Sequence, residues 1–182
     1  AGPWGYAACV TACEATCAAS CVVAGPVCVA CFDKCFALCT PACYSEDMYV
    51  LVGNGSEHLR AVPIGSVGPG DMVATTSAGA ASSVTLTRVK SNDKFSSAGG
   101  YSFTELRMAS GKVLQVTEDH VLAVASRGGA VRTLRAKGVL PGDELLTPGA
   151  RDVVVSVRPT IKSTKYNLVT EEGTVLVTDT AH

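Results

Sequence analysis

The sequence predicts a mainly β protein of two parts: a small disulfide-stapled α-hairpin at the N-terminus and a larger β domain. Three observations support this fold class. All nine cysteines fall between Cys9 and Cys43. The rest of the chain consists of short apolar runs separated by turn-forming residues, and one Pro-Gly-Asp segment occurs twice. We therefore expect a cysteine-rich helical hairpin over residues 1–42 and a β domain over residues 43–182.

The composition excludes several classes of function. The 15 Lys and Arg residues balance 16 Asp and Glu residues, for a formal net charge of −1, so the chain offers nucleic acid or anionic membranes no basic patch. Hydrophobic residues make up 47% of the chain, which permits a sizeable core. No apolar run reaches the roughly 18 residues of a transmembrane segment. Because the chain begins at Ala1 without a charged start, we expect a signal peptide to be absent or already removed.

The first eight cysteines indicate a helical hairpin. Most of them stand four residues apart, which puts them on one face of a helix, and the abundant Ala between them favours helix. Gly25-Pro26 interrupts the pattern, so we expect helices at about 7–22 and 27–39. Antiparallel partners should have a constant index sum, and these cysteines give 48 or 49. The pattern predicts four disulfides: Cys9–Cys39, Cys13–Cys35, Cys17–Cys31 and Cys21–Cys28.

Disulfides of this kind point to an oxidising compartment, and they stabilise a hairpin too small to fold on a core alone. The predicted location is therefore secreted or extracellular. The alternative is a thiolate metal cluster. However, zinc sites prefer Cys-x2-Cys spacing and often add His, whereas only Cys28 and Cys31 have that spacing and no His lies near them. We expect no metal and no other cofactor. Cys43 is left over, which makes it an intermolecular linker or a reactive thiol.

From Tyr44 onward, the sequence is typical of an all-β domain. Short apolar runs alternate with Gly, Asn, Asp, Ser and Pro, as expected of strands joined by turns. Only 131–139 has a pattern that fits a helical turn or two. The predicted strands include 48–52, 84–90, 101–108, 113–116, 121–125, 152–158 and 173–177.

The β part contains an internal repeat. The segment 67–73 (VGPGDMV) recurs 72 residues later as 139–145 (VLPGDEL). Pro-Gly-Asp is a turn-forming tripeptide, so two unrelated turns are one explanation. The matching apolar flanks, half a domain apart, favour instead a pseudo-two-fold structure built from two related halves.

Three segments form an ordered pattern: the domain-opening stretch 43–47 (CYSED), the stretch 64–71 that ends in Pro-Gly-Asp, and the strand 111–120 that ends in Thr-x-x-His. Together with the closing stretch 166–177, they resemble the Hint (Hedgehog/intein) superfamily of autoprocessing domains. The resemblance covers residues 43–182. It implies a horseshoe-shaped, pseudo-symmetric β fold, in agreement with the repeat.

A thiol that opens a domain is suited to attack the carbonyl just upstream. Attack of Cys43 Sγ on the Ala42 carbonyl would convert the scissile amide into a thioester, an N-to-S acyl shift. The amide nitrogen needs a proton to leave, and His120 is the candidate acid and base because its ordinary pKa near 6.5 suits both roles around neutrality. Thr117 is the candidate hydrogen-bonding partner of the scissile group. The resemblance implies these same roles for Thr117 and His120.

The sequence therefore predicts a self-processing protein that cleaves itself once, with its own N-terminal segment as substrate. Water, a small molecule or a sterol would resolve the thioester and release the cysteine-rich peptide. In sterol-transferring relatives an acidic residue follows the long strand near 84–90. Here Val89 and Lys90 occupy that region, with Asp93 beyond them, which argues against a sterol.

The C-terminal end admits a second reaction. Inteins end in His-Asn, and the Asn cuts the downstream junction, so His182 matches the penultimate His and is a further candidate catalytic residue if the parent chain continues. The ending also resembles the Hedgehog type, which cuts only upstream. The alternative function is a non-catalytic secreted disulfide-rich interaction module on a Hint-like scaffold.

Overall fold

The protein is described by a computed structural model over residues 42–53, 59–77, 80–125 and 131–179. The chain divides into two units between Pro41 and Ala42. The described residues all belong to the second unit, Ala42–His182. The predicted helices at 7–22 and 27–39 and their four disulfides lie outside the described residues.

The second unit is built almost entirely from strands, which confirms the mainly β prediction. No helix in the described ranges is long and apolar enough to cross a membrane. The elements in chain order are β1 (Tyr44–Ser45), β2 (Tyr49–Val52), β3 (Arg60–Pro63), the 3₁₀ helix η1 (Ile64–Ser66), β4 (Met72–Ser77), β5 (Ala80–Met108), β6 (Val113–Val116), β7 (Val121–Ala125), β8 (Val131–Arg135), the 3₁₀ helix η2 (Ala136–Gly138), β9 (Glu144–Thr147), β10 (Ala150–Thr170) and β11 (Val177–Thr178).

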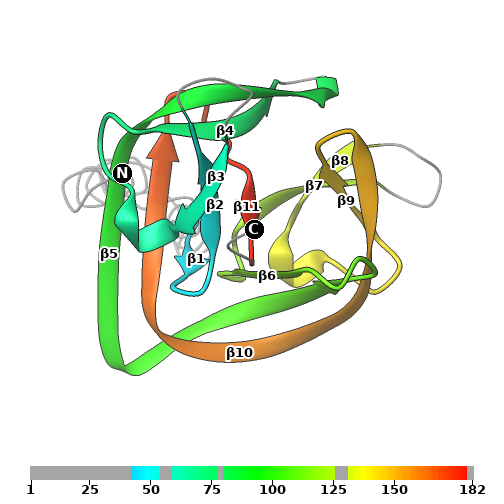
Figure 1. Cartoon of the computed structure of the whole chain (residues 1–182). Coiled ribbons are helices and arrows are strands. Elements are labelled where there is room, and N and C mark those ends of the chain that lie inside the picture. The colour runs from blue at the N-terminus through cyan, green and yellow to red at the C-terminus, as the bar shows by residue number, and fades with distance from the viewer. Residues whose placement is uncertain (1–41, 54–58, 78–79, 126–130, 180–182) are drawn as a thin grey trace, which may run out of the picture. The chain divides into compact units, whose positions relative to one another are not determined.

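Two long strands, β5 and β10, run side by side and turn a corner together (Figure 1). Their antiparallel pairing extends from Val154 opposite Met108 to Thr170 opposite Val89. The sequence predicted two separate strands, 84–90 and 101–108, where the structure has the single strand β5. That prediction is wrong because the polar segment between the two runs pairs with β10 instead of forming a turn.

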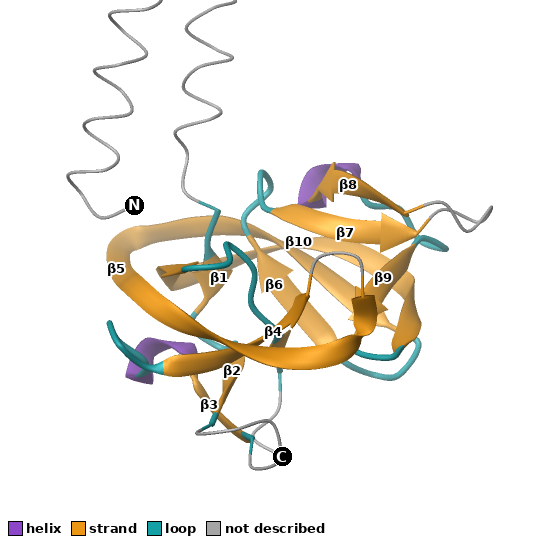
Figure 2. Cartoon of the chain, turned by 90° about the horizontal axis from the view of Figure 1, so that it is seen from above, coloured by secondary structure: helices purple, strands orange, loops and turns teal. Residues whose placement is uncertain are grey.

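The short strands β1 and β6 lie inside the curve of the long strands (Figure 2). The local strand order is β5-β6-β1-β10. β1 pairs with β6 only at Tyr44 opposite Val116, and with β10 at Tyr44 opposite Tyr166 and Ser45 opposite Lys165. The start of the domain is therefore held between β6 and β10.

Two other sequence predictions are corrected. The predicted strand 173–177 is mostly a turn and a loop, and only Val177 belongs to β11. The loop follows the sheet edge because Leu176 donates its N–H to the Ala74 carbonyl at 2.8 Å. In the segment 131–139, the structure forms β8 followed by η2, so the expected helical turn occupies only its second half.

The two Pro-Gly-Asp segments form equivalent turns, which confirms the pseudo-two-fold structure. In each, the Asp carboxylate accepts the backbone N–H three residues earlier, at 2.8 Å for Asp71 and 2.9 Å for Asp143. The turn glycines have φ of 97° and 94°, a left-handed conformation that favours glycine. Each turn docks on a long strand, since the Asp71 carbonyl accepts the Val89 N–H and the Asp143 carbonyl accepts the Val154 N–H, both at 2.8 Å.

A second pair of equivalent turns is also separated by 72 residues in the sequence. The Met48 N–H donates to the Ser45 carbonyl at 3.3 Å, and the His120 N–H donates to the Thr117 carbonyl at 2.9 Å. Their sequences also match, as Ser-Glu-Asp-Met at 45–48 and Thr-Glu-Asp-His at 117–120. The turn that follows the start of the domain is thus the structural counterpart of the turn that ends in His120.

The core joins the two halves. Equivalent residues from both halves are buried in one hydrophobic cluster, because both copies direct the same apolar positions inward. These equivalent pairs are Ile64 and Ala136, Val67 and Val139, Val73 and Leu145, and Val89 and Val154.

Candidate active site

Cys43 stands immediately before β1 and is fully buried, with 0% of its surface exposed. It is a free thiol. The preceding residue, Ala42, is partly exposed. The Ala42–Cys43 bond therefore lies where the chain enters the folded unit, with its thiol side inside and its upstream residue nearer solvent.

Thr117 forms hydrogen bonds with two backbone groups of Cys43, its N–H and its carbonyl. The Cys43 N–H, which belongs to the predicted scissile amide, donates to Thr117 Oγ1 at 3.0 Å. The Thr117 N–H donates to the Cys43 carbonyl at 2.9 Å, and the Thr117 hydroxyl reaches the same carbonyl at 3.5 Å. The structure thus places Thr117 against the amide nitrogen of Cys43, whereas its role at a scissile bond stays a prediction.

His120 lies in the same cluster. Only 7% of its surface is exposed, and its ring packs edge to face against Tyr44, with centroids 4.4 Å apart. The turn hydrogen bond from the His120 N–H to the Thr117 carbonyl fixes the two residues relative to each other. Its buried Nδ1 has no hydrogen-bond partner among the described residues, and this nitrogen is available to accept or deliver a proton.

Burial sets the protonation states of both reactive groups. It raises the pKa of the Cys43 thiol to about 11, and the positive charge of Lys165 offsets only part of this rise. Burial lowers the pKa of His120 to about 4, while a hydrogen bond to the Cys43 backbone acts in the opposite direction. The expectation that His120 titrates around neutrality is therefore wrong: the resting site holds a neutral thiol and a neutral imidazole.

Asp119 anchors the turn that carries Thr117 and His120. Its carboxylate contacts Arg135 at 3.1 Å and Lys137 at 2.9 Å, and these bonds hold its pKa below the ordinary value. The Ala136 N–H also donates to the His120 carbonyl at 2.8 Å. Asp119 and Tyr44 are not among the site residues that the sequence predicts. The match between 45–48 and 117–120 is the signal that would have marked the turn as a repeated structural unit.

The remaining predicted site residues lie outside the described parts of the chain. These are His182 and the eight cysteines that the sequence predicts to pair, Cys9, Cys13, Cys17, Cys21, Cys28, Cys31, Cys35 and Cys39. In the ranges that the structure does describe, no group of three or more His, Cys, Asp or Glu side chains is arranged to hold a metal ion.

The arrangement is suited to acyl transfer from nitrogen to sulfur. The nucleophile and the amide that it would break belong to the same residue, Cys43. A hydroxyl contacts the leaving nitrogen, and an imidazole with a free buried nitrogen lies beside the same backbone. These are the groups that a proton transfer from the thiol to the leaving amine requires.

Comparison with known proteins agrees with this fold. Among the solved structures with a similar fold is the bacterial intein-like domain from Clostridium thermocellum, which is 22% identical to this chain. The match has a TM-score of 0.60 and covers 75% of this chain and 93% of that one. The TvoVMA intein is 16% identical, with a TM-score of 0.58 over 78% and 99% of the two chains. An intein from a hyperthermophile is 15% identical, with a TM-score of 0.60 over 75% and 98%.

No curated protein matches the sequence. The family model described as the Hint module matches residues 32–182, which is most of the chain. The described strands have the fold of these intein and intein-like domains. The chain therefore belongs to the Hint family.

Proposed function

We propose that this protein cleaves itself once at the Ala42–Cys43 bond and releases residues 1–42. The proposal rests chiefly on one observation: the N–H of the amide to be broken donates to Thr117 Oγ1 at 3.0 Å. This bond, in which the hydroxyl oxygen accepts the N–H, fixes the orientation of the amide that Cys43 Sγ would attack, and orientation of the reacting groups lowers the barrier. The Hint fold supports self-processing in general.

In the first step, Cys43 Sγ attacks the Ala42 carbonyl carbon. The S–C bond forms and the C–N bond breaks, while the thiol proton passes through His120 to the leaving nitrogen. The product is a thioester between Ala42 and the Cys43 sulfur, with a free amine on Cys43. In the second step, water or another nucleophile adds to the thioester carbonyl, the C–S bond breaks and the thiol regains its proton.

His120 begins this sequence without a proton, because its pKa is about 4. It first acts as the base for the thiol, then as the acid for the amine. Thr117 holds the amide nitrogen and the Cys43 carbonyl in place, so its role is orientation. The nucleophile that resolves the thioester, the disulfides of the released peptide and its extracellular location are further parts of the proposal.

The test uses the purified full-length precursor, incubated near neutral pH with hydroxylamine, which attacks thioesters much faster than amides. Intact-mass spectrometry should find residues 1–42 carrying a hydroxamate. Hydroxylamine also cleaves Asn-Gly bonds, and Asn54-Gly55 is one, so the fragment mass must identify the cut.

Cys43→Ala should abolish release of 1–42 and leave any cut at Asn54-Gly55 unchanged, since that reaction needs no thiol. If the wild type and Cys43→Ala release 1–42 equally, self-processing through Cys43 is wrong. The non-catalytic interaction module then takes its place.

A further inference from the structure

The buried contact between Ser45 and Gln115 is the symmetry counterpart of the contact between Thr117 and Cys43. The displacement of 72 residues relates Ser45 to Thr117, and it relates Cys43 to Gln115. In one half of the repeat, a hydroxyl meets the backbone of the nucleophile. In the other half, a hydroxyl donates to an amide side chain, from Ser45 Oγ to Gln115 Oε1 at 2.7 Å.

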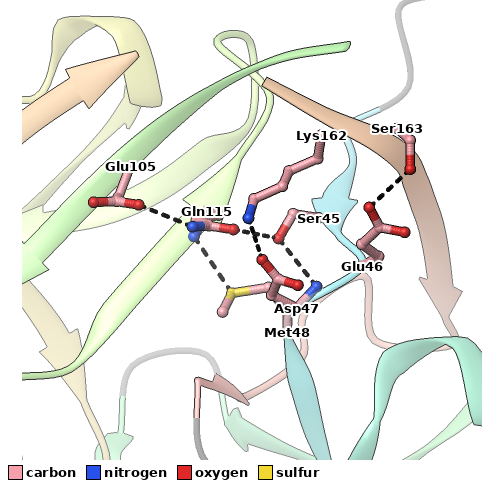
Figure 3. Close-up of polar contacts among 8 residues, drawn as sticks. All are labelled: Ser45, Glu46, Asp47, Met48, Glu105, Gln115, Lys162 and Ser163. Carbon is pink, nitrogen blue, oxygen red and sulfur yellow. Dashed lines mark hydrogen bonds and ion pairs between the residues drawn. The ribbon is translucent and has the colours of Figure 1, made fainter. Parts of the chain in front are cut away.

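Gln115 lies at the centre of a chain of hydrogen bonds that links β1 to β6 and β5 (Figure 3). Its Nε2 donates to Glu105 Oε2 at 2.9 Å, and its backbone N–H meets Met48 Sδ at 3.3 Å. Ser45 Oγ also accepts the Asp47 N–H at 3.4 Å. Ser45 is fully buried and Gln115 is 7% exposed, so a lost partner would leave a buried polar group unsatisfied.

The location of these hydrogen bonds at β1 matters for the proposed reaction. β1 has two residues and meets β6 at a single register pair, Tyr44 opposite Val116. Cys43 immediately precedes β1, and Thr117 immediately follows β6. The hydrogen bond between the scissile N–H and Thr117 therefore depends on a very short stretch of backbone pairing, which the Ser45–Gln115 bond reinforces from the next position of β1.

We propose that Ser45 and Gln115 are positioning residues for cleavage at Ala42–Cys43. Their side-chain hydrogen bond fixes β1 on β6 so that the scissile N–H stays on Thr117 Oγ1. This inference rests on the proposed self-cleavage and names residues that do not touch the reacting atoms. In this proposal, the turn at 45–48 supports the chemistry that takes place at its counterpart, the turn at 117–120.

The test compares three serine variants in the full-length precursor, with release of 1–42 by saturating hydroxylamine as the readout. Ser45→Ala should slow release about 10- to 100-fold, the usual effect of a misplaced reacting group. Ser45→Thr keeps the hydroxyl and should stay within about threefold of wild type. Ser163→Ala is the matched control. Its hydroxyl donates to Glu46 at the exposed side of the same turn (Figure 3), so its rate should stay unchanged.

Gln115→Glu adds a pH-dependent readout, and urea unfolding of the same variant at each pH separates a change in release from a change in stability. The new carboxyl would face Glu105, which Arg107 contacts at 3.0 Å, near the Asp47–Lys162 ion pair. Two carboxyls at hydrogen-bond distance share one proton, and their pKa is raised. Release should be near the wild-type rate while that proton is present and should fall about tenfold or more by pH 8. A flat profile would contradict the role of Gln115.

A second measurement separates this inference from the proposed function. In full-length protein carrying Cys43→Ala, which cannot cleave, amide exchange at position 43 reports the hydrogen bond to Thr117. Adding Ser45→Ala should speed that exchange about tenfold or more, whereas adding Ser163→Ala should not. If wild type does not cleave, the proposed function fails, and the exchange result alone decides the positioning role. Unchanged exchange and unchanged release after Ser45→Ala would overturn it.

Discussion

The pKa values of Cys43 and His120 predict that self-cleavage is nearly independent of pH around neutrality. The thiol ionises near pH 11 and the imidazole protonates near pH 4. Between pH 4 and pH 11, the Cys43 thiol keeps its proton and the His120 imidazole stays neutral. The two groups together therefore hold one titratable proton. The neutral pair and the reactive thiolate–imidazolium pair carry the same number of protons, so their ratio does not change with pH.

The expected contrast with an ordinary thiol is large. From pH 6 to pH 8.5, the thiolate fraction of a solvent-exposed thiol with a pKa near 9 rises about 200-fold. For the buried pair, the change in rate over the same range should be less than about twofold. The pKa values of the two groups differ by about seven units. Moving the proton from the Cys43 thiol to the His120 imidazole therefore costs on the order of 10 kcal/mol, without counting the attraction between the resulting thiolate and imidazolium. Around neutral pH the neutral thiol and imidazole are therefore strongly favoured over the thiolate–imidazolium pair.

The assay follows release of residues 1–42 from the full-length precursor at constant ionic strength, from pH 5.5 to pH 9. Hydroxylamine is raised until the rate no longer depends on its concentration, so that thioester formation limits the rate. His120→Gln is the matched variant. Without the imidazole the thiol must lose its proton to solvent, so the much slower residual rate should rise about tenfold per pH unit.

A wild-type rate that rises 100-fold between pH 6 and pH 8.5 would contradict proton transfer within the Cys43–His120 pair. It would mean that Cys43 ionises to solvent and that His120 is not its proton acceptor.

Three further outcomes are expected. Because folding lowers the pKa of His120 from about 6.5 to about 4, the folded state should lose about 3 kcal/mol of stability as the pH falls from 6.5 to 4. In Cys43→Ala protein, urea unfolding should detect this loss, and His120→Gln should remove it. His120→Ala should slow release of 1–42 by about 10²- to 10⁴-fold, and Thr117→Ala should slow it less, because Thr117 orients the amide without transferring its proton. Asp71→Ala and Asp143→Ala should each lower the free energy of unfolding by about 1 kcal/mol, since the two carboxylates accept equivalent turn hydrogen bonds. A large difference between these two would contradict the symmetry of the turns.

The sequence alone determined the strands whose apolar residues are contiguous and whose ends carry turn residues. The predicted segments 113–116 and 121–125 coincide with β6 and β7. The repeated Pro-Gly-Asp turn also predicted the two-fold organisation, because a turn of that geometry depends on local residues. The choice of Cys43, Thr117 and His120 as site residues rests on their residue types and on the resemblance to the Hint superfamily, and it stays a prediction.

Only the tertiary structure decided which distant segments meet and how deeply they are buried. The polar residues between 90 and 101 continue β5 because β10 lies beside them, and no local pattern encodes that partner. The pKa of His120 departs from its ordinary value because the folded chain excludes water from the ring. The Cys43 N–H meets Thr117, 74 positions away in the sequence, because β1 pairs with β6. Such contacts depend on packing between the two halves, which residue spacing within either half does not specify.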